Sequence, residues 1–245
     1  MDKKTIEILS KCCRGGYMEG LWLCRRALEG ESTRILVTPN AEMLSSGGGA
    51  LLSRADLFFP DGIGIRAAMR RLGRPAQEKT CGIELAQRLF ENYTARGEQV
   101  RVFLLGGRPG VAARAAERLG ERYGGVEICG VHHGYFDVKG EENREAIKKI
   151  NASGAELLIV CMGFPRQERW MLENRHRLPK IRLMMGLGGS LDVWSGDVPR
   201  APEAVRSAGL EWAYRALKQP SRLWRLPNLA RFAADVAALP RERLH

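Results

Sequence analysis

The chain has 245 residues, of which 44% are hydrophobic and 27% are charged, a balance that excludes wholesale disorder and indicates a globular protein with a substantial core. Lys and Arg outnumber Asp and Glu by 39 to 28, which gives a formal net charge of +11. This charge favours a polyanionic partner such as phosphate groups, nucleic acid or an anionic membrane surface.

The sequence shows no signal peptide and no stretch approaching the roughly 18 apolar residues of a spanning helix. Any membrane contact is therefore expected to be peripheral. The 6 cysteines form no C-x-x-C pair and several lie in apolar runs, which favours reduced thiols and a cytoplasmic location.

Short apolar runs recur along the chain, and each ends in turn-forming residues. Because they are apolar at every position, they predict strands that are covered on both faces. Segments with helical spacing lie between them, for example Gly82–Arg96 and Gly110–Tyr123, and Ser45–Gly49 predicts a helix break. This alternation predicts an α/β fold with a Rossmann-like, mostly parallel sheet flanked by helices. The runs are Ile35–Val37, Leu57–Phe59, Val102–Leu105, Val126–Cys129, Leu157–Cys161 and Leu183–Met185.

The pattern changes after about Gly196. Residues 200–245 contain nine basic and four acidic residues, and prolines divide them into short helical segments. We therefore expect an α/β core over residues 1–195 and a basic, helical C-terminal appendage over residues 196–245.

Polar and glycine residues follow the predicted strands. Ligands bind outside the carboxyl ends of the strands in such sheets, so these residues are expected to converge on one edge. They are Thr38, Asn40, Asp61, Gly106, Gly107, Gln167 and Asp192.

Asp61 lies between a proline and a glycine at the end of a strand. It can cap the next helix, or it can serve as a general base at the carboxyl end of the sheet. Gly62 and Gly64 leave room for a ligand to approach the backbone, which favours the second interpretation.

The turn at Gly106 and Gly107 resembles a phosphate-binding turn, although a plain tight turn fits equally well. It matches neither G-x-G-x-x-G nor G-x-x-x-x-G-K-[ST], which disfavours a nicotinamide oxidoreductase and a P-loop protein. Asp192 can accept hydrogen bonds from the hydroxyls of a sugar, or it can stabilise a turn or a helix cap. Gln167 follows the turn that begins at Gly163.

Arg215, Arg222 and Arg225 recur near helical spacing in the appendage, beside tryptophans, and their guanidinium groups suit a diphosphate at a membrane surface. A solvated basic face is the alternative. His132 and His133 lack a spaced third ligand, so we expect no metal site and no cofactor.

Several motifs, jointly and in order, resemble the WecG/TagA/CpsF family of glycosyltransferases over nearly the whole chain. They are Thr38–Glu42, Pro60–Gly64, Gly163–Glu168, Gly189–Asp192, Arg200–Pro202 and Leu210–Arg225.

The resemblance implies an inverting, metal-independent transfer of N-acetylmannosamine, or a related sugar, from a UDP-sugar to N-acetylglucosamine on undecaprenyl diphosphate. The resemblance also implies that the reaction takes place at the inner face of the plasma membrane and that the product feeds a cell-surface polymer such as wall teichoic acid. The resemblance implies that Asp61 is the general base and that Asp192 helps to bind the nucleotide. It also implies that the sugar pocket is lined by Thr38, Asn40 and Gln167, and that the diphosphate is bound by Arg215, Arg222 and Arg225.

The family usually has Glu-Arg-x-Thr-Gly where this chain has Glu78-Lys79-Thr80-Cys81-Gly82. Lys79, expected to bind substrate, therefore offers a point charge in place of a guanidinium fork, and the donor sugar stays open. The partners expected are the UDP-sugar, the lipid-linked acceptor and an anionic membrane surface, with a homo-oligomer possible and no nucleic acid. A basic nucleic-acid-binding α/β protein is the alternative function.

Overall fold

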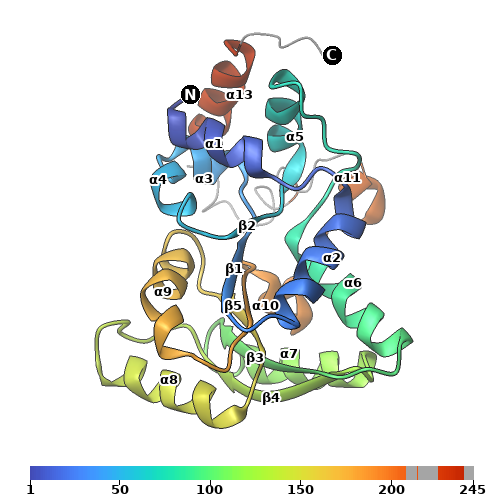
Figure 1. Cartoon of the computed structure of the whole chain (residues 1–245), viewed down its shortest axis with the longest axis vertical. Coiled ribbons are helices and arrows are strands. Elements are labelled where there is room, and N and C mark those ends of the chain that lie inside the picture. The colour runs from blue at the N-terminus through green and yellow to red at the C-terminus, as the bar shows by residue number, and fades with distance from the viewer. Residues whose placement is uncertain (208–213, 215–225, 240–245) are drawn as a thin grey trace.

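A computed structural model describes residues 1–207, 214 and 226–239 of the chain. The centre is one sheet of six parallel strands in the order β2-β1-β6-β5-β3-β4 (Figure 1). The predicted Rossmann-like α/β fold is thus confirmed. The strands are β1 (Arg34–Val37), β2 (Leu57–Phe58), β3 (Val100–Gly106), β4 (Val126–His132), β5 (Leu157–Cys161) and β6 (Leu183–Gly186).

The strands are apolar at successive positions because both faces of the sheet are covered. Along β1, Ile35 and Val37 pack into one layer of the core and Leu36 packs into the other. Along β3, Phe103 belongs to the first layer and Val102 to the second. Two apolar layers therefore enclose the sheet, as expected for parallel strands.

Helices from distant parts of the chain make up each layer. The Ile35 layer includes side chains from α1 (Lys3–Lys11), α3 (Ala41–Ser45), α4 (Gly49–Leu52), α5 (Gly62–Arg71), α8 (Glu141–Ser153), α9 (Arg166–Asn174) and α13 (Leu226–Ala237). The Leu36 layer includes α2 (Gly16–Leu28), α6 (Gly82–Ala95), α7 (Val111–Arg122) and α10 (Ser190–Trp194). The break between α3 and α4 lies where Ser45–Gly49 predicts it. A short 3-10 helix (Arg175–Arg177) and α11 (Glu203–Ser207) complete the described elements.

The connections diverge between the neighbouring strands β3 and β5. The chain leaves β3 for α7 in the Leu36 layer, and it leaves β5 for α9 in the Ile35 layer. Such a switch point is where open α/β sheets commonly bind ligands. The turns at Gly107 and Gly163 lie there, and the Gly107 N–H donates to the Cys161 carbonyl at 3.1 Å.

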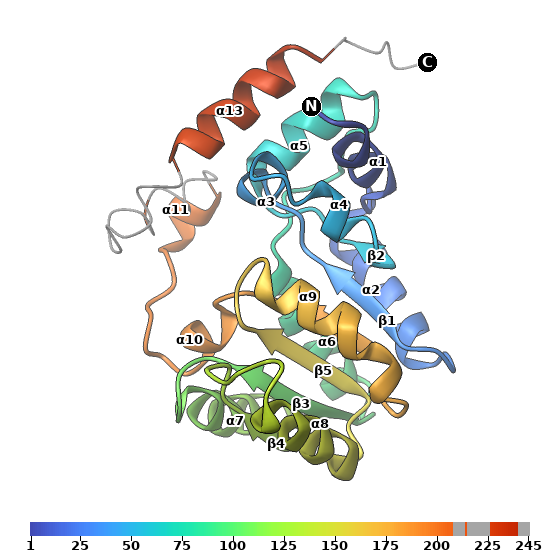
Figure 2. The same cartoon turned by 90° about the vertical axis from the view of Figure 1, so that its left-hand side faces the viewer.

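Helix α13 belongs to the predicted appendage and packs against α3 and α5 (Figure 2). Its Phe232 and Val236 are buried in the same layer as Ile65 of α5. The described part of the appendage thus shares its core with α5, and the boundary near residue 196 stays a prediction. No helix among the described residues is long and apolar enough to cross a membrane.

Candidate functional site

The turns that follow β1, β2 and β6 are joined by hydrogen bonds at the carboxyl edge of the sheet. The Asp61 N–H donates to the Pro39 carbonyl at 3.0 Å. The hydroxyl of Thr38, which is buried, donates to the Gly186 carbonyl at 3.3 Å. The turn that contains Thr38 and Asn40 therefore lies beside the turn that contains Asp61.

Asp61 occupies the N-cap position of α5 with an extended backbone, but its side chain makes no capping hydrogen bond. The capping interpretation of this carboxylate is therefore wrong. The side chain is half-buried at the carboxyl edge of the sheet. A partly desolvated carboxylate in that place has the properties that a general base needs.

Thr80 holds the turn that carries Asp61. Its hydroxyl donates to the Pro60 carbonyl, and its own carbonyl accepts from the Gly62 N–H at 3.4 Å. Lys79 precedes it, half-buried and without an ion pair to any residue that the structure describes. The substrate-binding role predicted for Lys79 stays a prediction.

Tyr17 anchors the Lys79–Cys81 segment to helix α2, a role that sequence reasoning missed. Its hydroxyl donates to the Glu84 carboxylate and accepts from the Cys81 N–H at 2.9 Å. Glu78 accepts from the Tyr17 backbone N–H at 2.7 Å, and the Arg200 guanidinium pairs with Glu84. Nothing local to Tyr17 in the sequence signals these contacts, because each partner lies more than sixty positions away.

Asn40, in the turn after β1, caps a helix. It is the N-cap of α3, and its side-chain oxygen accepts from the Met43 N–H at 3.0 Å. Asn and Asp at this position typically stabilise a helix by about 1 kcal/mol. The amide nitrogen of this half-buried side chain is the group with which Asn40 would reach a sugar.

Gln167 is fully buried and links two turns of the edge. Its side-chain oxygen accepts from the Gly188 N–H at 3.0 Å, and its nitrogen donates to Glu168 at 2.8 Å. In this arrangement Gln167 fixes the turn after β6 relative to the start of α9. Its predicted contact with the sugar stays a prediction.

Glu168 is a buried carboxyl group, 1% exposed, and one of its oxygens accepts no hydrogen bond from the described residues. Burial raises the pKa of Glu168 above its ordinary value, despite the hydrogen bond from Gln167. This favours the neutral acid.

Two of the predicted glycines need their residue type for different reasons. At Gly106, with φ +145°, an added Cβ would lie 2.3 Å from the Cys161 carbonyl oxygen, so the site is closed by packing. At Gly163, with φ +77°, no atom lies within 4 Å of that position. The second turn therefore leaves open space where a ligand can approach the backbone.

Asp192 lies in the first turn of α10, which packs against α7. Its side chain is half-buried and its carbonyl accepts from the Val198 N–H at 2.9 Å. Gly106, Gly107, Gly163 and Asp192 thus gather around β3, β5 and β6, whereas Asp61 follows β2. Four strand spacings separate β2 from β3, about 19 Å across the edge.

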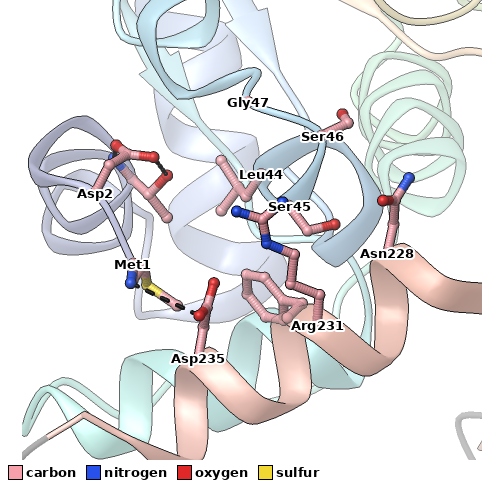
Figure 3. A pocket seen from close by; sticks show the side chains of 11 residues that line it. Met1, Asp2, Leu44, Ser45, Ser46, Gly47, Asn228, Arg231 and Asp235 are labelled. Atoms are coloured by element: carbon pink, nitrogen blue, oxygen red, sulfur yellow. Dashed lines mark hydrogen bonds and ion pairs between the residues drawn. The ribbon is translucent and has the colours of Figure 1, made fainter.

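Arg215, Arg222 and Arg225 lie outside the described residues. The pocket in Figure 3, of about 400 Å³, lies between α1, α3 and α13. Its polar lining includes Asp2, Ser45, Asn228 and Arg231, and it contains none of the predicted site residues.

His132 and His133 lie at and after the end of β4. Their rings pack with Phe136, and burial lowers the pKa of His132, which favours a neutral imidazole. Over residues 1–207, 214 and 226–239, no group of three His, Cys, Asp or Glu side chains is placed to hold a metal ion.

Comparison with known proteins covers almost the whole chain. Residues 17–243 match the sequence model of the Glycosyl transferase WecG/TagA/CpsF family. One relative, from Bacillus spizizenii, is named N-acetylglucosaminyldiphosphoundecaprenol N-acetyl-beta-D-mannosaminyltransferase. It is 36% identical over 187 residues, which cover 76% of this chain and 70% of the relative. The chain therefore belongs to the WecG/TagA/CpsF family of glycosyltransferases.

Proposed function

We propose that this glycosyltransferase moves N-acetylmannosamine, or a related sugar, from a UDP-sugar to N-acetylglucosamine linked to undecaprenyl diphosphate. The observation that carries the proposal is the relative's name, joined to a match of the family over nearly the whole chain. The product would enter a surface polymer of the wall teichoic acid kind. The enzyme would act at the inner face of the plasma membrane.

Asp61 would remove the proton from the attacking hydroxyl of the acceptor. Its side chain is not used to cap α5, and the turn that carries it is fixed by Pro39 and by Thr80. The acceptor oxygen would then bond to the anomeric carbon while the bond to UDP breaks, and UDP would leave with the electron pair. A single displacement of this kind inverts the anomeric centre.

The spread of the predicted residues suits a long donor. The nucleotide would lie near Asp192 and the glycine turns at the switch point, and the sugar would extend toward Thr38 and Asn40. Arg215, Arg222 and Arg225 would stabilise the negative charge on the departing UDP, a task that preorganised cations can perform without a metal ion. Lys79 would contribute to it from the Asp61 side of the edge, since it precedes Thr80, which holds the Pro60 turn.

The test is transfer by Asp61→Asn, measured as UDP released from UDP-N-acetylmannosamine with a lipid-linked N-acetylglucosamine diphosphate. Loss of a general base typically lowers kcat by about 10²–10⁴-fold. Asp137→Asn is the control, because Asp137 is exposed and its side-chain oxygen accepts from the Lys139 N–H, a bond that Asn can keep. Full turnover by Asp61→Asn would refute the role of the base, and no transfer by the wild type with this donor would refute the substrate.

A further inference from the structure

Helix α5 begins directly after Asp61 and has an unusually basic outer face. Its sequence contains Arg66, Arg70 and Arg71 and no acidic residue. None of the three arginines forms an ion pair with the residues that the structure describes. No carboxylate of the described residues neutralises these three guanidinium groups, so the outer face of α5 is a concentrated positive charge that attracts an anionic surface.

The periodicity of the helix places these arginines together with two apolar residues. Ile63, which is 44% exposed, and Ala67 point away from the core, whereas Ile65, Ala68 and Met69 are buried. At about 100° per residue, the outward set spans roughly 140° of the helix circumference. We call this set, made up of Ile63, Arg66, Ala67, Arg70 and Arg71, the α5 face.

We propose that the α5 face docks on the surface of an anionic phospholipid bilayer. Arginines attracted by the negative surface potential, next to an exposed apolar side chain that can enter the headgroup region, are the features of a helix that lies on a membrane. An oligonucleotide fits less well, because the face offers Ile63 and Ala67 where single strands require aromatic side chains for stacking.

The location of the face gives the docking a purpose, and this step rests on the proposed function. A polyprenyl acceptor is held in the bilayer with its diphosphate sugar at the surface. Ile63 lies two positions after Asp61, within one helical turn, about 3 Å along the axis. Docking of α5 would therefore bring the proposed base to the depth at which the acceptor hydroxyl is found.

The direct test is sedimentation of the full chain with vesicles of phosphatidylcholine, alone or with phosphatidylglycerol. The variant is Arg66→Gln/Arg70→Gln/Arg71→Gln. Each arginine near an anionic surface contributes about fivefold to binding, so the loss of three is expected to weaken binding to phosphatidylglycerol vesicles on the order of 100-fold. Raised salt should weaken the binding of the wild type in the same direction.

The matched control is Arg144→Gln/Lys148→Gln/Lys149→Gln on helix α8, whose three side chains are exposed. It removes the same charge at the opposite end of the molecule from α5 (Figures 1 and 2). It should bind vesicles nearly as the wild type does. Equal losses in both variants would show that net charge alone drives binding, and would overturn the proposal. Loss of oligonucleotide binding with unchanged vesicle binding would also overturn it.

Transfer assays separate this proposal from the proposed function. With a water-soluble, short-chain diphosphate acceptor the α5 variant should keep the kcat of the wild type, and with the acceptor embedded in vesicles its rate should fall. A rate unaffected by the substitutions on vesicles would refute the role of the face. If the wild type used neither acceptor, the proposed function would fail, whereas the vesicle sedimentation would still decide whether α5 binds the bilayer.

Discussion

Replacing Tyr17 by Phe removes one hydroxyl that serves two partners. It donates to the Glu84 carboxylate and accepts from the Cys81 N–H at 2.9 Å. The ring would keep its contact with Phe59 and its place under the Arg88 guanidinium, 4.3 Å from the ring centre. The substitution therefore isolates the hydrogen bonds from the packing.

The expected loss follows from the two bonds. A hydrogen bond to a charged group contributes about 1.5–3 kcal/mol, and a buried amide left without a partner costs about 1–3 kcal/mol. Arg200 remains paired with Glu84, so the carboxylate keeps a partner when the hydroxyl is removed. The lower part of the range for a hydrogen bond to a charged group therefore applies. We expect the free energy of unfolding to fall by about 2–4 kcal/mol.

The same substitution should affect catalysis, because Cys81 follows Thr80, which holds the Pro60–Gly62 turn. A shift of about 1 Å in a reacting group can cost about 10²-fold in rate. We expect kcat to fall by roughly that factor, with a smaller change in KM, since Tyr17 itself is not proposed to touch substrate. Urea unfolding and steady-state transfer kinetics measure the two effects.

Tyr93→Phe is the matched control. Tyr93 is also buried, and the Arg25 guanidinium lies over its ring at 4.8 Å. Its hydroxyl forms no hydrogen bond with the described residues, so both stability and kcat should stay near the wild type. The reasoning would be refuted if Tyr17→Phe unfolded within about 0.5 kcal/mol of the wild type, the range of neutral surface changes, and turned over at the same rate.

Two further predictions use the edge of the sheet. Burial raises the pKa of Glu168 in the folded state, so the folded protein holds this proton more tightly than the unfolded chain does. The resulting stabilisation is fully present below the unfolded pKa and is lost as pH rises through the folded pKa. Glu168→Gln should therefore make the Tm less dependent on pH, and should raise it relative to the wild type on the alkaline side; parallel melting curves from pH 4 to 9 would contradict this. Gly106→Ala should destabilise by several times the roughly 1 kcal/mol expected for Gly163→Ala, because only the first places a Cβ against the Cys161 backbone, 2.3 Å from its carbonyl oxygen. Equal denaturation midpoints for the two variants would show that the turn after β3 can relax.

The class of fold and the edge that carries the site were accessible from the sequence. Runs such as Leu157–Cys161 are apolar throughout because both faces of a parallel strand are covered, and this local property is written directly in the chain. The location of Asp61 after such a run placed it at the carboxyl edge. Local periodicity also set the limits of α6 and α7 to within one residue of the segments predicted from their apolar spacing.

The tertiary structure alone decided which segments meet. Three contacts join positions far apart in the sequence. They are the pairing of Arg34 with Leu183 in neighbouring strands, the hydrogen bond from Thr80 to Pro60 and the hydrogen bonds around Tyr17. The burial of Gln167 and the empty space beside Gly163 belong to the same group. The physical reason is that a sequence pattern reflects local preferences, namely whether a residue is buried or exposed and which backbone conformation it favours. Strand order and hydrogen bonds between distant segments depend instead on the simultaneous packing of all layers.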